Sequence, residues 1–139
     1  MLRSDWLMRQ IEMLGEFLRQ IRKLIAEGRH GDALALSEEA IGEVFDTEPD
    51  LVLSLSGSGI VALLSAGSDE DAAFRSLALG EILVARIEAF EASGRDGEAT
   101  ADRERARTVL ESALPLADDE GKARIGELLM WLDDGRWQA

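Results

Sequence analysis

The first 27 residues carry apolar side chains on two adjacent helical stripes rather than on one. The first stripe repeats at intervals of four and three residues and consists of Leu7, Ile11, Leu14, Leu18, Ile21 and Ile25. The second stripe lies beside it and consists of Trp6, Met13, Phe17 and Leu24. Because residues three and four apart share a helix face, this spacing predicts an amphipathic helix over residues 4–27. One stripe is enough to join a core, so we expect the second stripe to meet a further partner.

The rest of the chain repeats the helical pattern in five more segments, with turn-forming residues between them. The predicted helices cover residues 32–45, 51–65, 69–92, 100–114 and 119–133. Asp32 and Asp50 are the expected N-caps of the first two of these helices. The segment 51–65 is apolar nearly all round, which predicts that it is the central element of the core. No segment alternates with a period of two residues, so strands are not expected.

Six helices joined by short turns predict an all-α fold, in which antiparallel helical hairpins form a single domain over residues 1–139. Two architectures fit this pattern, a compact helical bundle and an α-solenoid of stacked hairpins. Glycine costs about 1 kcal/mol relative to alanine inside a helix, so glycines at helical positions predict close packing of backbones. Such glycines are Gly15, Gly42, Gly57, Gly59, Gly80 and Gly126.

Small residues recur at similar positions in three of the predicted helices. They are Ala33 and Ala40, then Ala72, then Ala106 and Ala113. This pattern resembles the second helix of tetratricopeptide repeats, in which small side chains let paired helices approach closely. The opening segment, Arg3-x-Asp5-Trp6-Leu7-Met8-Arg9-x-Ile11-Glu12, is similar to the start of an uncharacterised bacterial family of small helical proteins related to these repeats. The resemblance implies a right-handed α-solenoid and brings no catalytic residues.

The chain is acidic, with a formal net charge of -13. Neutralising phosphates requires clustered Lys and Arg, so we expect neither nucleic acid nor an anionic membrane surface as a partner. The charge is uneven, because residues 1–31 carry a net charge of +2 and the remainder carries -15. The most apolar run, residues 51–66, is shorter than the ~20 residues that a membrane-spanning helix needs. The chain has no cysteine, which is typical of a reducing compartment, and we expect a cytoplasmic protein.

The sequence offers few groups for catalysis. Its single histidine, His30, lies in a predicted turn, and there is no cysteine. No motif therefore places an imidazole beside a serine or threonine to act as the general base that a nucleophile needs. The acidic clusters lack the loop spacing of Ca²⁺ sites, and we expect neither a metal nor a cofactor. We therefore predict that the protein is not an enzyme. A hydrolase that uses convergent carboxylates and a divalent metal is the remote alternative.

These observations favour a non-enzymatic helical scaffold that mediates protein-protein interaction. Self-association through the first helix, as a homodimer, is the simplest case, because two like helices can pair about a two-fold axis. Aromatic and arginine side chains are common at the centres of interfaces. The candidate interaction residues are Trp6, Arg9, Met13, Phe17, Leu24 and Trp137. The alternative is an adaptor whose groove binds a basic or helical peptide segment, and no small-molecule substrate is inferred.

Overall fold

The computed structural model describes residues 2–65 and 69–134, and within these ranges the side chains of residues 2–7 and 70 are left out. The elements, in chain order, are α1 (Leu2–Ala26), α2 (His30–Phe45), α3 (Pro49–Leu53), α4 (Gly57–Leu64), α5 (Asp69–Ala92), α6 (Asp96–Ala113), the 3-10 helix η1 (Leu114–Leu116) and α7 (Asp119–Asp134). The described ranges contain no strand, so the predicted all-α fold is confirmed.

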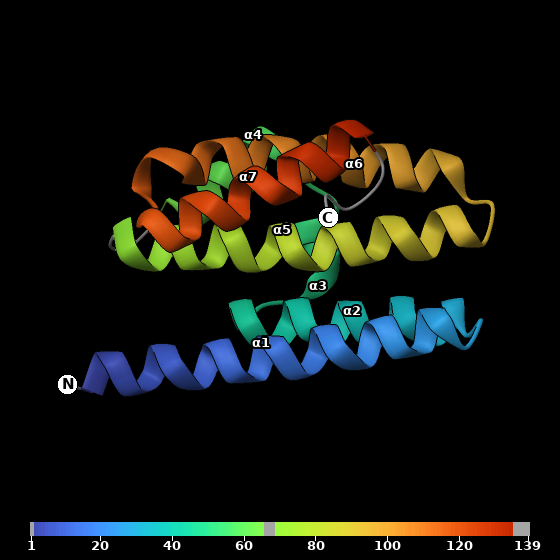
Figure 1. Ribbon diagram of the computed structural model, residues 1–139, viewed down its shortest axis with the longest axis horizontal. Coiled ribbons are helices and arrows are strands. Elements are labelled where there is room, and N and C mark those ends of the chain that lie inside the picture. The colour runs from blue at the N-terminus through green and yellow to red at the C-terminus, as the bar shows by residue number, and fades with distance from the viewer. Residues whose placement is uncertain (1, 66–68, 135–139) are drawn as a thin grey trace.

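The α5 helix is the central element of the molecule. The α1–α2 hairpin packs against it from one side, and α6 and α7 pack against it from the other (Figure 1). In residues 78–90 every side chain is buried except those of Glu81 and Glu88. A helix covered on both sides has to be apolar over most of its circumference, and the sequence of α5 meets that requirement.

The prediction of one central helix over residues 51–65 is wrong. This segment forms two short helices, α3 and α4, separated at residues 54–56. The Ser54 hydroxyl donates to the Leu51 carbonyl at 2.8 Å, and the Ser56 hydroxyl accepts from the Gly59 N–H at 3.3 Å as the N-cap of α4. Serine side chains that bond to nearby backbone groups compete with helix continuation, which explains the break.

The two long hairpins reverse direction through the same turn. Gly28 and Gly94 both have φ of 77°, a left-handed conformation that glycine adopts without steric cost. The next residues also match, with φ and ψ of -92° and 65° at Arg29 and -95° and 67° at Arg95. The N–H of Arg29 donates to the Leu24 carbonyl at 2.9 Å, and the N–H of Arg95 makes the equivalent bond at 2.8 Å.

This turn places the helix starts earlier than the sequence predicted. Residue 32 was expected to cap α2, but α2 begins at His30, and Asp32 lies in its first turn and accepts from Arg29 Nε at 2.9 Å. The helix expected from residue 100 begins at Asp96 in the same way. The two turns lie 66 residues apart and share the pattern Gly-Arg-x-Gly-acid-Ala. This internal repeat was the signal that the comparison of alanine spacings missed.

Glycines at helical positions mark close packing at only some of the predicted places. A Cβ at Gly80 would lie 2.4 Å from a methyl of Leu110, and one at Gly57 would lie 2.6 Å from Cβ of Thr108. These glycines let α5 and α4 approach α6, which confirms the prediction there. It is wrong for Gly15 and Gly126, which have no such neighbour within 4 Å.

Candidate functional site

The first third of α1 projects beyond the helix that covers the rest of it. At 1.5 Å per residue, the 25 residues of α1 span about 37 Å, whereas the 16 residues of α2 span about 24 Å. Figure 1 shows the amino-terminal end of α1 extending past the end of α2. This end of α1 is therefore not paired with α2.

The two apolar stripes of α1 are covered together over its carboxy-terminal part. Ile21, of the first stripe, is fully buried, and Met13, Phe17 and Leu24, of the second stripe, are half-buried and pack against the core of the same protomer. At these residues the second stripe is therefore partly covered within the protomer, which reduces the surface that it leaves for the expected further partner. The physical reason is that α2 and α5 meet α1 from two directions, so one helix needs two apolar stripes.

The apolar surface of α1 that remains exposed lies near its amino terminus. Met8 is 60% exposed and Ile11, of the first stripe, is 51% exposed. Arg9 is exposed between them. The side chain of Trp6 and the whole of Trp137 lie outside the described residues.

Ile11 forms one wall of a hollow that we call the apolar groove. It lies between α1, α5 and the η1–α7 corner, and its volume is about 580 Å³. Its apolar lining consists of Ile11, Leu14, Ala73, Phe74, Leu77, Ala78, Leu116 and Ala117. A hollow with a mostly apolar lining beside an exposed apolar helix end is a candidate interaction site.

Charged side chains occupy the wall of the apolar groove opposite α1. Arg124 donates to both carboxylate oxygens of Glu81, at 2.8 and 2.7 Å, and this hydrogen bonding raises the pKa of the Arg124 guanidinium. Asp118 accepts from the Gly121 N–H at 2.7 Å, and Glu120 is exposed. Because Arg124 and Glu81 neutralise each other, the start of α7 leaves this wall acidic.

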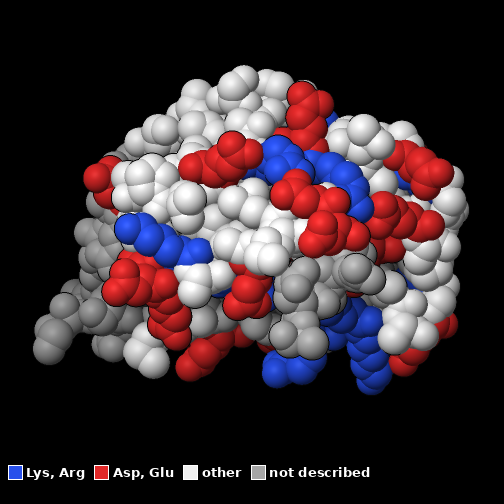
Figure 2. Space-filling view, turned by 45° about the horizontal axis from the view of Figure 1, so that its top comes forward, with Lys and Arg blue, Asp and Glu red and all other residues white. Residues whose placement is uncertain are grey.

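The basic side chains form no continuous patch on the face shown in Figure 2, where they lie among acidic ones. Arg103 pairs with Glu91 at 2.9 Å, and Arg107 pairs with Asp133 at 2.6 Å. In the described ranges no three His, Asp or Glu side chains are grouped so that they could hold a metal ion. No described helix is long and apolar enough to cross a bilayer.

The structure also buries a charged pair that the sequence analysis did not single out. Arg86 of α5 donates from Nε to Asp102 of α6 at 2.8 Å, and Asp102 is 1% exposed. A signal was present, because Arg86 interrupts the most apolar part of its helix and Asp102 lies in line with Ala99 and Ala106.

Searches of protein-family models, curated proteins and solved structures found no significant match to this chain. The resemblance to tetratricopeptide-like proteins therefore has only the quoted residues behind it.

Proposed function

We propose that this protein is a non-enzymatic helical scaffold that self-associates through the apolar groove. In this arrangement the projecting end of α1 from one copy lies in the groove of a second copy, and the exchange is reciprocal about a two-fold axis. The observation that carries the proposal is the exposure of Met8 and Ile11 beside an open apolar groove. Burying large apolar side chains contributes roughly 1.5–3 kcal/mol each.

Charge favours a second copy as the occupant of the groove. Residues 1–31 carry +2 and the remainder carries -15, so two identical molecules attract most when the amino-terminal part of one meets the acidic body of the other. The groove wall around Asp118 and Glu120 is such an acidic surface. The amino-terminal part of α1 from one copy is therefore electrostatically complementary to the groove wall of a second copy.

The internal repeat supports a solenoid-like arrangement over a closed bundle. The two matching turns are 66 residues apart, close to twice the period of about 34 residues in tetratricopeptide repeats. We infer that α1–α2 and α5–α6 are two hairpins stacked directly on each other, with α3 and α4 linking them and α7 covering the second. The absence of cysteine is typical of a reducing compartment, so the proposed location is the cytoplasm.

The test is the molar mass in solution across a range of concentrations, measured by light scattering after size exclusion. We expect the wild-type chain to form a dimer and Ile11→Glu to be monomeric, because a carboxylate in the groove would be desolvated without a partner. The matched control is Leu63→Glu, since Leu63 is 44% exposed on α4 and does not line the groove. A wild-type chain that stays monomeric at hundreds of micromolar overturns the proposal.

A cross-linking experiment tests the geometry, and the chain suits it because it has no native cysteine. A mixture of Met8→Cys and Leu116→Cys proteins should form a mixed disulfide under mild oxidation, because the proposed dimer brings these two positions together. The control mixture pairs Met8→Cys with Leu63→Cys. Equal yields from the two mixtures would mean that the copies do not meet in this way.

A further inference from the structure

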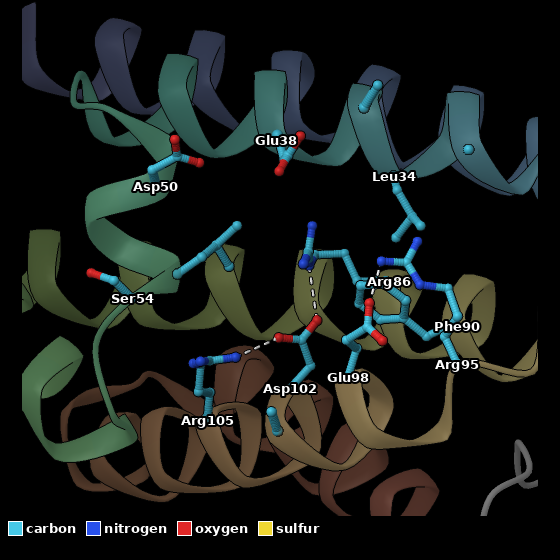
Figure 3. A pocket seen from close by; sticks show the side chains of 14 residues that line it. Leu34, Glu38, Asp50, Ser54, Arg86, Phe90, Arg95, Glu98, Asp102 and Arg105 are labelled. Carbon is cyan, nitrogen blue, oxygen red and sulfur yellow. Dashed lines mark hydrogen bonds and ion pairs between the residues drawn. The ribbon is translucent and has the colours of Figure 1, made fainter.

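A second hollow lies between α2, α3, α5 and α6 and shares no lining residue with the apolar groove (Figure 3). We call it the Arg86 cavity. Its volume is about 690 Å³, which lies within the range of roughly 300–1,000 Å³ for pockets that hold small ligands. Its lining combines three arginines and four acidic residues with apolar side chains, and this composition makes it a polar site.

Arg86 and Arg105 each have N–H donors that make no hydrogen bond within the described part of the protein. Asp102 accepts from Arg86 Nε at 2.8 Å and from Arg105 Nη1 at 2.9 Å. Arg86 also donates to the Ser37 hydroxyl at 3.1 Å, and Arg105 donates to the Leu55 carbonyl at 2.9 Å. A guanidinium carries five N–H donors, so in each arginine most of the donors remain for a further acceptor.

Charge is divided between the two sides of the cavity. Arg86, Arg105 and Asp102 together place two positive charges and one negative charge on the side formed by α5 and α6. Glu38 and Asp50 stand on the opposite side, on α2 and α3 (Figure 3). Neither of them makes an ion pair with any side chain in the described part of the protein. The cavity is therefore positive on one side and negative on the other.

The ring of Phe90 forms part of the cavity lining and contacts two of its arginines. The guanidinium groups of Arg86 and Arg95 lie 5.0 and 4.9 Å from the centre of the Phe90 ring. Arg95 also pairs with Glu98, so its charge is already balanced. These stacking contacts hold Arg86 in place at the cavity, and they leave its remaining donors to meet a ligand.

Stability alone is a weak reason for the charged pair in this place. Replacing a buried ion pair by apolar groups of similar volume is often neutral or stabilising. The first hairpin supports this point, because Gln20 and Leu36 occupy the positions that correspond to Arg86 and Asp102 in the internal repeat. The same type of hairpin therefore forms without the pair.

We propose that the Arg86 cavity binds a small zwitterion with one carboxylate and two cationic groups, in the class of basic amino acids and dipeptides that contain one. The carboxylate lies against Arg86 and Arg105, whose planar forks match its geometry. The cationic groups lie against Glu38 and Asp50, which would repel a phosphate. Three arginines and four acids give the lining a net charge of -1, which the +1 charge of this ligand complements.

The first test uses the dipeptide Lys-Leu, with binding measured by calorimetry and amide chemical shifts. We expect Lys-Leu to bind at millimolar concentration or below, and its carboxamide to bind at least about tenfold more weakly. N-acetyl-Lys-Leu stands for the end of a protein chain, because it keeps the carboxylate and loses one cation. A tenfold loss on acetylation supports a free small ligand, whereas undiminished binding assigns the site to a protein carboxy terminus and overturns the proposal.

The second test changes the cavity. Glu38→Gln should weaken Lys-Leu binding several-fold, and Glu39→Gln, at the exposed neighbouring position, should leave it unchanged. The double variant Arg86→Gln with Asp102→Leu introduces the residues of the first hairpin, and it should fold and lose the preference for the free carboxylate. If Lys-Leu does not bind at millimolar concentration, or binds equally to the double variant, the proposal is wrong.

Discussion

The α1–α2 and α5–α6 hairpins share their turn and differ in what surrounds them. Each turns through a left-handed glycine followed by an arginine that pairs with an acid three residues on, Arg29 with Asp32 and Arg95 with Glu98. The α5 helix lies between the α1–α2 hairpin and the helices α6 and α7, whereas α1 packs against α2 and α5 and extends past α2 at its amino-terminal end (Figure 1). The local sequence therefore determines the turn, and the position of each hairpin in the fold determines which of its helix faces are buried.

This difference explains why the buried charged cluster lies in one hairpin and the exposed apolar side chains lie in the other. In the enclosed hairpin, polar groups that point inward need partners, and Asp102 accepts hydrogen bonds from both Arg86 and Arg105. In the outer hairpin, the uncovered end of α1 carries exposed Met8 and Ile11 instead. The polar cavity lies where α5 and α6 face α2 and α3, and the apolar groove lies where α1 faces α5 and the η1–α7 corner.

The largest expected effect comes from removing the buried carboxylate of the second hairpin. Asp102→Ala leaves Arg86 and Arg105 without their shared acceptor and should lower the free energy of unfolding by about 3–5 kcal/mol. Asp32→Ala removes an exposed ion pair of the first hairpin and should cost less than about 1 kcal/mol. Urea unfolding of both variants measures the difference. Equal losses of unfolding free energy would show that the buried Asp102 contributes no more to stability than the exposed Asp32.

A smaller effect, with opposite signs in the two hairpins, is expected from glycine-to-alanine substitutions. Gly80→Ala should destabilise the protein by about 1–3 kcal/mol, because the new Cβ would overlap the Leu110 side chain. Gly15→Ala should stabilise it by up to about 1 kcal/mol, because alanine favours the helix and the site has open space. Thermal unfolding of both variants measures the two changes. A lower melting temperature for Gly15→Ala as well would contradict the open space found around Gly15.

The sequence predicted features that depend on local periodicity. The α1, α5 and α7 helices agree with it within a few residues, because each has a long apolar stripe and a clear end. It did not predict the break at Ser54 and Ser56, where side-chain bonds to the backbone outweigh the apolar pattern. It also missed the pairing of Arg86 with Asp102, which requires knowing that α5 and α6 are neighbours. The apolar surroundings of each residue along its helix indicate burial, but they do not identify the partner.

The smallest effect concerns an ion pair between equivalent positions of the two hairpins. Arg22 and Glu88 correspond in the internal repeat, and Arg22 Nη2 lies 3.4 Å from the Glu88 carboxylate. Burial raises the pKa of Glu88 more than the attraction of Arg22 lowers it. The folded chain therefore holds this proton more tightly than the unfolded chain, and the contribution of Glu88 to stability declines as pH rises from its ordinary pKa through its raised one.

Glu88→Gln removes this dependence, so the variant should melt slightly above the wild type at neutral pH. The gap should close in acid, where the wild-type carboxyl is also protonated and resembles the amide. Paired melting curves across this pH range measure the gap while the other carboxyl groups titrate alike in both proteins. If the wild type melts above the variant at neutral pH, the contact between Arg22 and Glu88 outweighs burial, and the two hairpins are held together there by charge rather than by packing.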